Sequence, residues 1–317
     1  MENRVGSSPK KRIAFGWYGG KFSHLEWLLP LLPTTHHYCE PFGGSAAVLL
    51  NRDPSPVETY NDIDGEVVNF FRALRDAPDE LIRRIALTPF AREELQIACH
   101  DATPDNPIER ARRFYVRARQ TRTGLAQSAT PGRWAYCVAT SRAGVAGAIS
   151  RWFGGIEALF HIADRLLRVQ IEHLDALEVI RKYDSEQTLF YCDPPYVHQT
   201  RGDVRAYAYE MTDDAHRQLA ELLHSVKGKV AISGYRCKLM DELYHDWYCT
   251  EAPPRICHSV KQLRQEVLWT NYDPQEFITQ NRKSREQSSN GATKVLSLDL
   301  NLFFMRGVCS FLKITKI

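Results

Sequence analysis

A carboxylate and a phenol ring follow directly after a strongly apolar stretch, in the turn Asp193-Pro194-Pro195-Tyr196. The preceding residues 188–192 are apolar and aromatic, which predicts a buried strand. Two prolines cannot continue a sheet ladder, so we expect the strand to stop at Asp193. The Asp193 carboxylate and the Pro194 carbonyl would then accept the two hydrogens of an amino group, with Tyr196 stacked on the ring that carries it. The alternative is a strand-ending turn with a capping Asp.

A second chemical segment lies near the N-terminus, at Trp17-Tyr18-Gly19-Gly20-Lys21. Paired glycines let a backbone approach a ligand closely. Lys21 offers a cation, and Trp17 and Tyr18 offer aromatic faces. The alternative is a glycine turn that leads into a helix over 23–32.

A third segment combines a short strand over 37–40 with the turn Pro41-Phe42-Gly43-Gly44-Ser45 and a helix that opens at 46–51. A strand, a glycine turn and a helix N-terminus form the usual cradle for a nucleotide-like ligand. Here Glu40 would bind the amino group of a methionine moiety, and Phe42 would line an apolar wall. The spacing is not GxGxxG, which argues against a dinucleotide.

Two acids follow the next expected strand, which covers 57–61. An acidic residue at the end of a second strand, about 20 residues after a glycine turn, suits bonding to ribose hydroxyls. Either acid could instead be the N-cap of a helix over 65–75. Their positions favour Asp62 as the ligand and Asp64 as the cap.

Composition limits the class of protein. The chain has 317 residues, of which 44% are hydrophobic, so it can bury a large core in one elaborated domain or two. A net charge of +3 means that any nucleic-acid site needs locally clustered charge. The eight cysteines form no CxxC pair and are interpreted as reduced thiols. A polar N-terminus and the lack of a long uncharged apolar run predict a cytoplasmic protein that does not bind membranes.

An arginine cluster lies between about 76 and 165, where short helical stretches replace the strand–helix alternation. Helices are expected over 79–99, 107–120 and 156–167, with a loop-rich basic surface over 121–150. Six arginines occur within thirteen residues, at 110, 112, 113, 117, 119 and 122. Because few acids interrupt this cluster, we expect DNA backbone contacts from Arg112, Arg117, Arg119 and Arg122. The alternative is a solvated charged face. Phe114 and Tyr115 are expected to pack inward.

Alternation resumes after the basic region. Strands are expected over 169–171, 188–192, 228–233, 247–251 and 266–271, and helices over 174–183, 213–226 and 238–245. Thr212 would cap the helix that starts at 213. The polar, aromatic loop between Tyr196 and Met211 is where a lid would lie.

In this order, the segments resemble the D12 class of DNA adenine-N6 methyltransferases, the Dam family. The resemblance covers about 13–274 and rests on residues 17–21, 40–44, Asp62 and 193–196, together with the segment 266–272. It implies an α/β, Rossmann-like fold that binds S-adenosylmethionine, with an inserted, mainly helical DNA-recognition domain. The implied parts are a disordered tail (1–11), a catalytic domain (12–75 and 166–274), the helical insert (76–165), and a linker with an unassigned tail (275–317).

The resemblance also implies an activity: site-specific transfer of a methyl group from S-adenosylmethionine to N6 of a flipped adenine in double-stranded DNA. The enzyme would act as a monomer on DNA and need no metal, with a restriction endonuclease as a candidate partner. The catalytic residues would be Asp193, Pro194, Pro195 and Tyr196. The cofactor would be held by Trp17, Tyr18, Lys21, Glu40, Phe42, Gly43, Gly44, Asp62 and Asp193.

The sequence departs from the family pattern at two points. The family's glycine turn often reads Phe-x-Gly-x-Gly, and Ala46 stands in the last Gly position, where it is expected to be tolerated at a helix start. The segment Arg119–Leu125 resembles the loop that reads the DNA site, but an intercalating aromatic and an Asn of that loop are here Arg122 and Thr123. This second departure puts recognition of GATC in question and leaves the chemistry unaffected.

Three other functions share parts of this pattern. An amino-methylase acting on cytosine N4 or protein glutamine would share the Pro-Pro-Tyr geometry, but Asp at 193 and the arginine-rich insert argue against it. A non-catalytic, sequence-specific DNA-binding protein with a vestigial methylase site is disfavoured by the intact 193–196 and 17–21 segments. A nucleotide-dependent oxidoreductase is disfavoured by the missing dinucleotide fingerprint.

Overall fold

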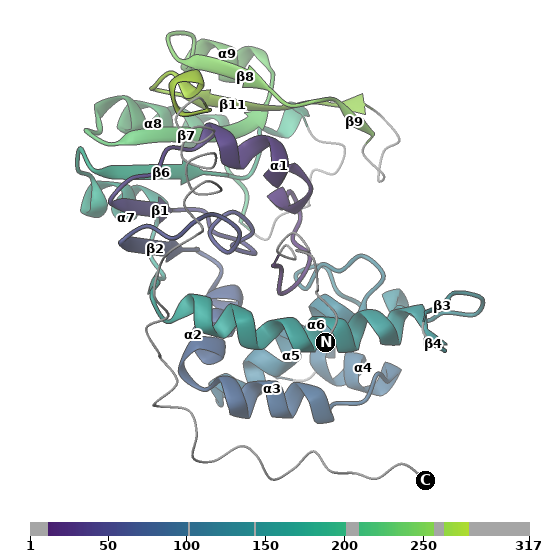
Figure 1. The fold of residues 1–317 in the computed structure, drawn as a ribbon. Helices are drawn as coiled ribbons and strands as arrows, with labels where there is room; N and C mark the ends of the chain where they lie inside the picture. The colour runs from purple at the N-terminus through teal and green to yellow at the C-terminus, as the bar shows by residue number, and fades with distance from the viewer. Residues whose placement is uncertain (1–11, 101, 143, 201–208, 257–262, 279–317) are drawn as a thin grey trace, which may run out of the picture. The chain divides into compact units, whose positions relative to one another are not determined.

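A seven-stranded sheet in the order β5-β2-β1-β6-β7-β11-β8 forms the centre of the protein (Figure 1). The structure is a computed structural model that describes residues 12–100, 102–142, 144–200, 209–256 and 263–278. Pairing is parallel from β5 to β7, and β11 is antiparallel to both of its neighbours. The strands are β1 (His37–Glu40), β2 (Val57–Asn61), β5 (Gln170–Glu172), β6 (Thr188–Cys192), β7 (Lys229–Tyr235), β8 (Tyr248–Glu251) and β11 (Glu266–Thr270).

Strands β1, β6 and β11 are buried along their whole length. This burial accounts for the apolar stretch of β6, as is typical of strands covered on both faces, whereas β1 and β11 also bury the carboxyl groups of Glu40 and Glu266. The chain runs from β1 outward to β2 and β5, and then from β6 outward to β7. The strand order therefore reverses between β1 and β6. In open α/β sheets, the carboxyl ends of strands at such a reversal form the ligand site.

Three helices cover one face of the sheet: α7 (Ala176–Tyr183), α8 (Asp213–Ser225) and α9 (Lys238–Leu243). Their buried residues join those of β1, β6, β7 and β11 in one hydrophobic cluster. The Thr212 hydroxyl accepts a hydrogen bond from the Ala215 amide, so the predicted cap of α8 is confirmed. The helix expected over 23–32 is a succession of three short turns of helix: η1 (Lys21–His24), α1 (Leu25–Leu28) and η2 (Leu29–Leu31).

The helix expected at 46–51 is wrong, since residues 47–51 form turns. Ala46, which precedes them, has a φ of 53°. The expectation that Ala46 is tolerated at a helix start is therefore also wrong. An alanine in this left-handed conformation costs about 1–2 kcal/mol, because its Cβ approaches the following carbonyl oxygen. The family's glycine at this position would avoid that strain.

Five helices gather beside the β2 end of the sheet (Figure 1): α2 (Gly65–Asp76), α3 (Pro78–Leu87), α4 (Arg92–His100), α5 (Pro107–Gln120) and α6 (Gly147–Leu166). The single helix expected over 79–99 is two helices, separated near Pro89. Helix α6 begins well before the predicted start at 156. A Cβ on Gly155 would lie 2.7 Å from the Tyr115 hydroxyl, so this glycine allows α6 to pack closely on α5. The sequence pattern indicated a helix start at this glycine pair because glycine is a poor helix former.

An aromatic core joins these helices to the segment before β1. Phe15 meets Phe70 of α2 and Phe114 of α5 edge to face, at centroid distances of 5.2 and 5.0 Å. Tyr115 of α5 lies 5.5 Å from Trp152 of α6. Phe114 and Tyr115 are buried, as predicted. The described residues up to Phe277 belong to one compact unit, and the division into a catalytic domain and an insert stays a prediction.

The remaining described elements are short. They are η3 (Pro131–Arg133), η4 (His198–Thr200), the pair β3 (Ser141–Arg142) and β4 (Val145–Ala146), and the pair β9 (Arg255–Ile256) and β10 (Leu263–Arg264). Among the described helices, none is both long and apolar enough to cross a bilayer. The predicted disordered tail, most of the predicted lid loop and nearly all of the predicted linker and C-terminal tail lie outside the described residues.

Candidate active site

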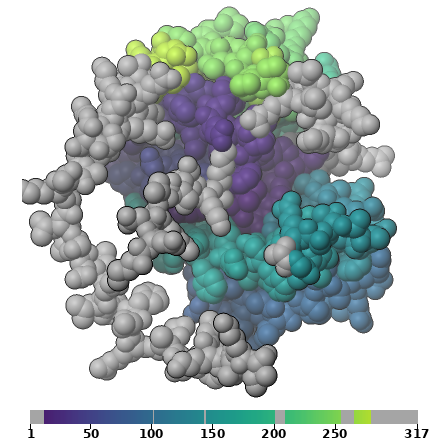
Figure 2. Space-filling view, turned by 45° about the vertical axis from the view of Figure 1, so that its right-hand side comes forward, coloured from purple at the N-terminus to yellow at the C-terminus, as the bar shows by residue number. Residues whose placement is uncertain are grey.

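A cavity of about 380 Å³ lies at the carboxyl ends of β1 and β6, where the strand order reverses. In the space-filling view, the purple N-terminal residues lie between the green and yellow C-terminal strands and the teal residues of α6 (Figure 2). Most of the predicted site residues line this cavity. They are Trp17, Tyr18, Lys21, Glu40, Phe42, Gly43, Gly44, Asp62, Asp193 and Pro195. Pro194 and Tyr196 are buried beside it and are not among the lining residues.

The ammonium group of Lys21 forms an ion pair with the Asp193 carboxylate, with Nζ 2.7 Å from Oδ1 and 2.8 Å from Oδ2. Lys21 also donates a hydrogen bond to the Gly19 carbonyl, at 2.7 Å. Burial raises the pKa of Asp193, and the Lys21 ammonium opposes that shift. For Lys21 burial acts to lower the pKa, but attraction to Asp193 and Glu266 leaves it raised. The two groups therefore form a buried ion pair, and the sequence pattern gave no sign that it is Lys21 that binds Asp193.

A second buried carboxylate, Glu266, lies behind this pair at the start of β11. The Tyr196 hydroxyl donates to Glu266 Oε2 at 2.6 Å and lies 3.2 Å from Asp193 Oδ1. Glu266 Oε1 is 3.8 Å from the Lys21 ammonium nitrogen. Burial raises the pKa of Glu266 to about 7. The sequence analysis assigned Glu266 to a strand and gave it no role, although an acid within an apolar, buried strand was a usable signal.

The Tyr196 ring packs against other residues of the protein, and its stacking on a substrate base stays a prediction. It is only 5% exposed. The Lys21 ammonium lies 5.0 Å from its centroid, and Tyr235 packs against it edge to face at 4.9 Å. This arrangement gives no support to the expected stacking of Tyr196 on a substrate ring. It gives Tyr196 a hydrogen-bonding role between two carboxylates.

The glycine turn after β1 is fixed by the packing of large rings. A Cβ on Gly43 would lie 2.2 Å from the Tyr60 ring, and one on Gly44 would lie 2.5 Å from Trp17 Nε1. Side chains are therefore excluded at both positions, and the bare backbone borders the cavity. The Gly44 amide donates to Asp62 Oδ2 at 2.7 Å, which ties the turn to the end of β2.

The acids around this turn take separate roles. Asp64 Oδ1 accepts a hydrogen bond from the Glu66 amide at the start of α2, so its predicted capping role is confirmed. Asp62 lines the cavity, and burial raises its pKa to about 6. Glu40 also lines the cavity, where burial raises its pKa to about 8 although the Tyr38 hydroxyl donates to it. The cavity thus carries two buried carboxyl groups that a cationic or hydroxylated ligand would stabilise in the ionised form.

Gln127 reaches the same cavity from the loop after α5. Its side-chain amide donates to Asp64 Oδ2 at 2.7 Å. The basic loop of the sequence therefore borders the ligand cavity. No motif or spacing marked Gln127 in the sequence, because its partner lies 63 residues away.

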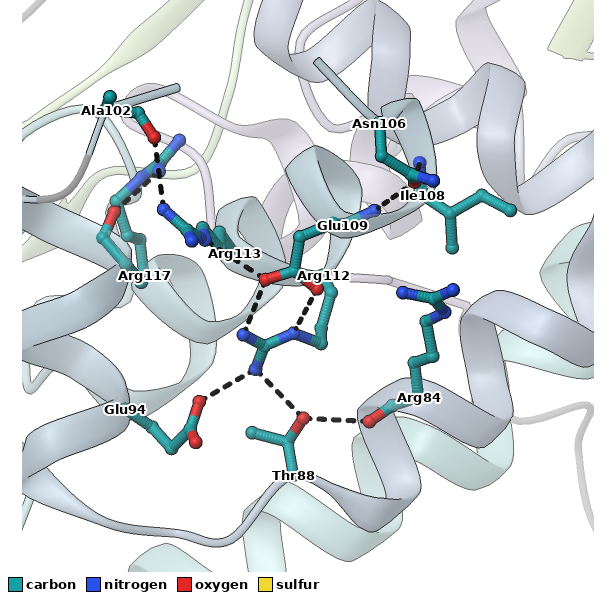
Figure 3. Close-up of polar contacts among 11 residues, drawn as sticks. Arg84, Thr88, Glu94, Ala102, Asn106, Ile108, Glu109, Arg112, Arg113 and Arg117 are labelled. Atoms are coloured by element: carbon teal, nitrogen blue, oxygen red, sulfur yellow. Dashed lines mark hydrogen bonds and ion pairs between the residues drawn. The ribbon is translucent and has the colours of Figure 1, made fainter. Parts of the chain in front are cut away.

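The arginine cluster does not have the free charges that the sequence suggested (Figure 3). Arg112 donates two hydrogen bonds to Glu109 and one to Glu94, and its side chain is 13% exposed. Arg117 pairs with Glu66 at 2.7 Å. The premise that few acids interrupt the cluster is therefore wrong, since Glu66, Glu94 and Glu109 neutralise these arginines. Arg112 and Arg117 therefore have acidic partners within the protein, and their contact with DNA stays a prediction.

The later arginines of the cluster are less enclosed. Arg119 donates to the Arg151 carbonyl at 2.7 Å, and Arg122 is exposed, with a weak bond of 3.3 Å to the Gly132 carbonyl. Neither is part of the acid-paired group. Their contact with DNA stays a prediction.

The sheet order, with a cavity at the strand reversal and the Asp-Pro-Pro-Tyr turn beside it, defines a Rossmann-like α/β protein with its ligand site at the switch point of the sheet. The chain belongs to the D12 class N6 adenine-specific DNA methyltransferases, whose family model matches residues 17–265. It is therefore an enzyme of DNA adenine methylation, and S-adenosylmethionine is the cofactor that this membership implies.

Individual relatives are consistent with the family. The chain is 24% identical over 245 residues to the DNA adenine methylase of Salmonella typhi, covering 74% of this chain and 84% of that one. It is 28% identical over 137 residues to the type II methyltransferase M1.LlaDCHI of Lactococcus lactis subsp. cremoris, covering 39% and 45% of the two chains. A solved SAM-dependent methyltransferase from Agrobacterium tumefaciens aligns with a TM-score of 0.35 and 9% identity over 80% of this chain and 62% of that one, which supports no further conclusion.

Proposed function

We propose that this enzyme transfers a methyl group from S-adenosylmethionine to N6 of an adenine that is flipped out of double-stranded DNA. One observation carries the proposal: the Asp193 carboxylate borders a cavity that Glu40 and Asp62 also line. An amine acceptor and a cofactor with an amino acid moiety and a ribose would find complementary groups there. The name of the Lactococcus relative supports a restriction endonuclease as a candidate partner.

The cavity residues fit the cofactor by their chemistry. Glu40 would bind the ammonium of the methionine moiety, and Asp62 would accept hydrogen bonds from ribose hydroxyls. Trp17 and Phe42 would supply apolar contact. When bound, S-adenosylmethionine supplies a methyl group on an activated, positively charged sulfur.

The protein's task is to make a weak nucleophile react. The adenine amine has its lone pair delocalised into the ring. Hydrogen bonds from its two hydrogens to Asp193 and the Pro194 carbonyl favour a pyramidal nitrogen, and the carboxylate stabilises the positive charge that develops there. Alignment of amine and methyl group supplies the remaining acceleration. Extruding the base costs a few kcal/mol, which contacts in the cavity must offset.

Sequencing that detects N6-methyladenine tests the proposed function directly. DNA from cells that express the protein should carry methylated adenine within a defined sequence, and DNA from cells that express Asp193→Asn should not. Wild-type protein that binds DNA but leaves adenine unmodified would support the non-catalytic alternative. Methylation on cytosine instead would refute the assignment of the substrate base.

Cofactor binding should release a proton from Glu40. The pKa of Glu40 is about 8 in the protein alone, because burial disfavours its anion. At pH 7 the carboxyl group is therefore mostly protonated, and an arriving ammonium group favours ionisation. Calorimetry in buffers of different ionisation enthalpy should show up to one proton released on binding. Glu40→Gln should abolish most of that release, and equal release in both proteins would place the amino group elsewhere.

Arg122 and Arg112 should differ in their effects on DNA binding. Arg122→Gln should weaken binding and reduce the salt slope of log K by about one unit, because an exposed guanidinium releases a counterion when it meets a phosphate. Arg112→Gln is the matched control, since its charge is already neutralised by Glu94 and Glu109. It should leave the slope unchanged and lower the unfolding temperature. A reduced salt slope for Arg112→Gln, with an unchanged slope for Arg122→Gln, would show that Arg112 and not Arg122 contacts DNA.

A further inference from the structure

Asp193 does not act as an isolated anion. The Lys21 ammonium contacts both of its oxygens, so the two groups together carry no net charge. A neutral pair offers little stabilisation to a positive charge that develops on the substrate amine, since the attraction of Asp193 is largely cancelled by Lys21. The chemistry of the proposed function therefore calls for a further negative charge near this pair.

Glu266 is placed to supply that charge. Its Oε1 lies 3.8 Å from the Lys21 nitrogen, its side chain is 6% exposed, and it is not among the residues that line the cavity. Its other oxygen accepts the hydrogen bond of Tyr196, which also lies close to Asp193. Two carboxylates thus share one ammonium and one phenol proton.

We propose that Glu266 is a positioning residue of the reaction. Its carboxylate attracts the Lys21 ammonium and accepts the hydrogen bond that orients Tyr196. Asp193, Glu266 and Lys21 together then carry a net negative charge when the substrate amine becomes cationic. This proposal rests on the proposed function and adds to it a residue that does not touch the substrate. A negative charge that stabilises the substrate amine only as that amine becomes cationic should affect turnover more than substrate binding.

The ionisation of Glu266 should control the rate near neutral pH. Its pKa is about 7, because burial opposes the anion. As pH rises through that value the carboxyl loses its proton, the cluster gains a negative charge, and methyl transfer should become faster. The titratable groups that face Glu266 or share its cluster are Lys21, Asp193 and Tyr196, with Tyr191 of β6, Glu40 of β1 and Tyr235 opposite it on β7. On β8, Glu251 pairs with Val267, so its side chain points to the other face of the sheet.

The test compares Glu266→Gln with wild type in single-turnover methyl transfer at saturating cofactor and DNA. Glutamine keeps the size of the side chain and an oxygen that accepts from Tyr196, but it carries no charge. We expect the rate at slightly alkaline pH to fall on the order of 10–100-fold, with little change in the Kd of cofactor or DNA. The rise of the wild-type rate through neutral pH should be absent in the variant. Saturating cofactor keeps the ionisation of Glu40 and Asp62 out of this profile.

Two further variants keep the test decisive. Glu266→Asp retains the charge and should retain part of the pH-dependent rise, which a purely structural role would not predict. Glu251→Gln removes an exposed carboxylate on the neighbouring strand and should match wild type. If Glu266→Gln fails to fold, the pH dependence of the methyl-transfer rate in Glu266→Asp and in wild type provides the test. A wild-type rate that does not change with pH across the neutral range overturns the proposal.

The outcomes separate this proposal from the proposed function. Wild-type protein that methylates no adenine refutes the function itself. Wild-type protein that is active, together with a Glu266→Gln variant of the same rate and pH profile, refutes only the role of Glu266.

Discussion

Replacing Asp193 with Asn should lower the single-turnover rate of adenine methylation on the order of 10²–10³-fold, which is the usual effect of removing one preorganised partner of a developing charge. Asparagine keeps the shape of the side chain but carries no charge, and it can turn an N–H toward the substrate amine. The substitution also removes the carboxylate whose two oxygens the Lys21 ammonium contacts. Lys21 then keeps Glu266 as its neighbouring carboxylate, at 3.8 Å. A cation would then lie where the substrate nitrogen becomes positive, so the loss should fall on turnover.

Rapid-quench measurement of methyl transfer at saturating DNA and cofactor gives this rate. Calorimetry of cofactor binding and thermal unfolding of the same variant show whether the site and the fold persist. Asp214→Asn is the matched control, because the Asp214 side chain is 91% exposed at the start of α8. A wild-type rate for Asp193→Asn would mean that the Asp-Pro-Pro-Tyr segment is only a strand-ending turn.

Replacing Arg165 with Leu should destabilise the protein by about 3–5 kcal/mol, which is typical when one partner of a buried ion pair is removed. Arg165 at the end of α6 donates to Glu58 of β2, at 2.7 Å to Oε1, and to the Leu49 carbonyl at 3.0 Å. Glu58 is fully buried. Without Arg165 the Glu58 carboxylate would keep the Ser55 amide, at 3.1 Å, and the more distant Arg52 guanidinium, at 3.7 Å. This ion pair therefore ties the long helix to the sheet.

Urea denaturation of the variant measures this loss. The double variant Glu58→Leu with Arg165→Leu should recover much of it, because apolar side chains of similar size replace a buried ion pair at little cost. Arg168→Leu is the control, since the nearby Arg168 makes one hydrogen bond of 3.3 Å to the Ser55 carbonyl. It should change stability by less than about 1 kcal/mol. A double variant no more stable than Arg165→Leu alone would show that packing, and not the unpaired charge, causes the loss.

Most strands of the central sheet and the position of the Asp-Pro-Pro-Tyr turn could be predicted from local sequence. Short stretches that end in proline or an acid located β1, β2 and β6, and they placed Asp193, Glu40 and Asp62 directly after or at strand ends. Because parallel strands end at one edge of a sheet, these residues were expected to meet, and they line one cavity. Capping by Asp64 and Thr212 was also predictable, since a cap and its helix are neighbours in sequence.

The pairing of the charged side chains could not be predicted from the sequence, because most partners come from distant segments. Arg112 meets Glu94 from another helix, and Arg117 meets Glu66 across 51 residues. Lys21 meets Asp193 across 172 residues, and Tyr196 meets Glu266 across 70. The close packing of Gly155 in α6 against Tyr115 of α5 likewise joins two distant segments. Local sequence predicts secondary-structure propensity and helix capping, because these depend on residues that are neighbours in the chain. Whether a buried charge is neutralised depends on partners that folding brings together from distant segments.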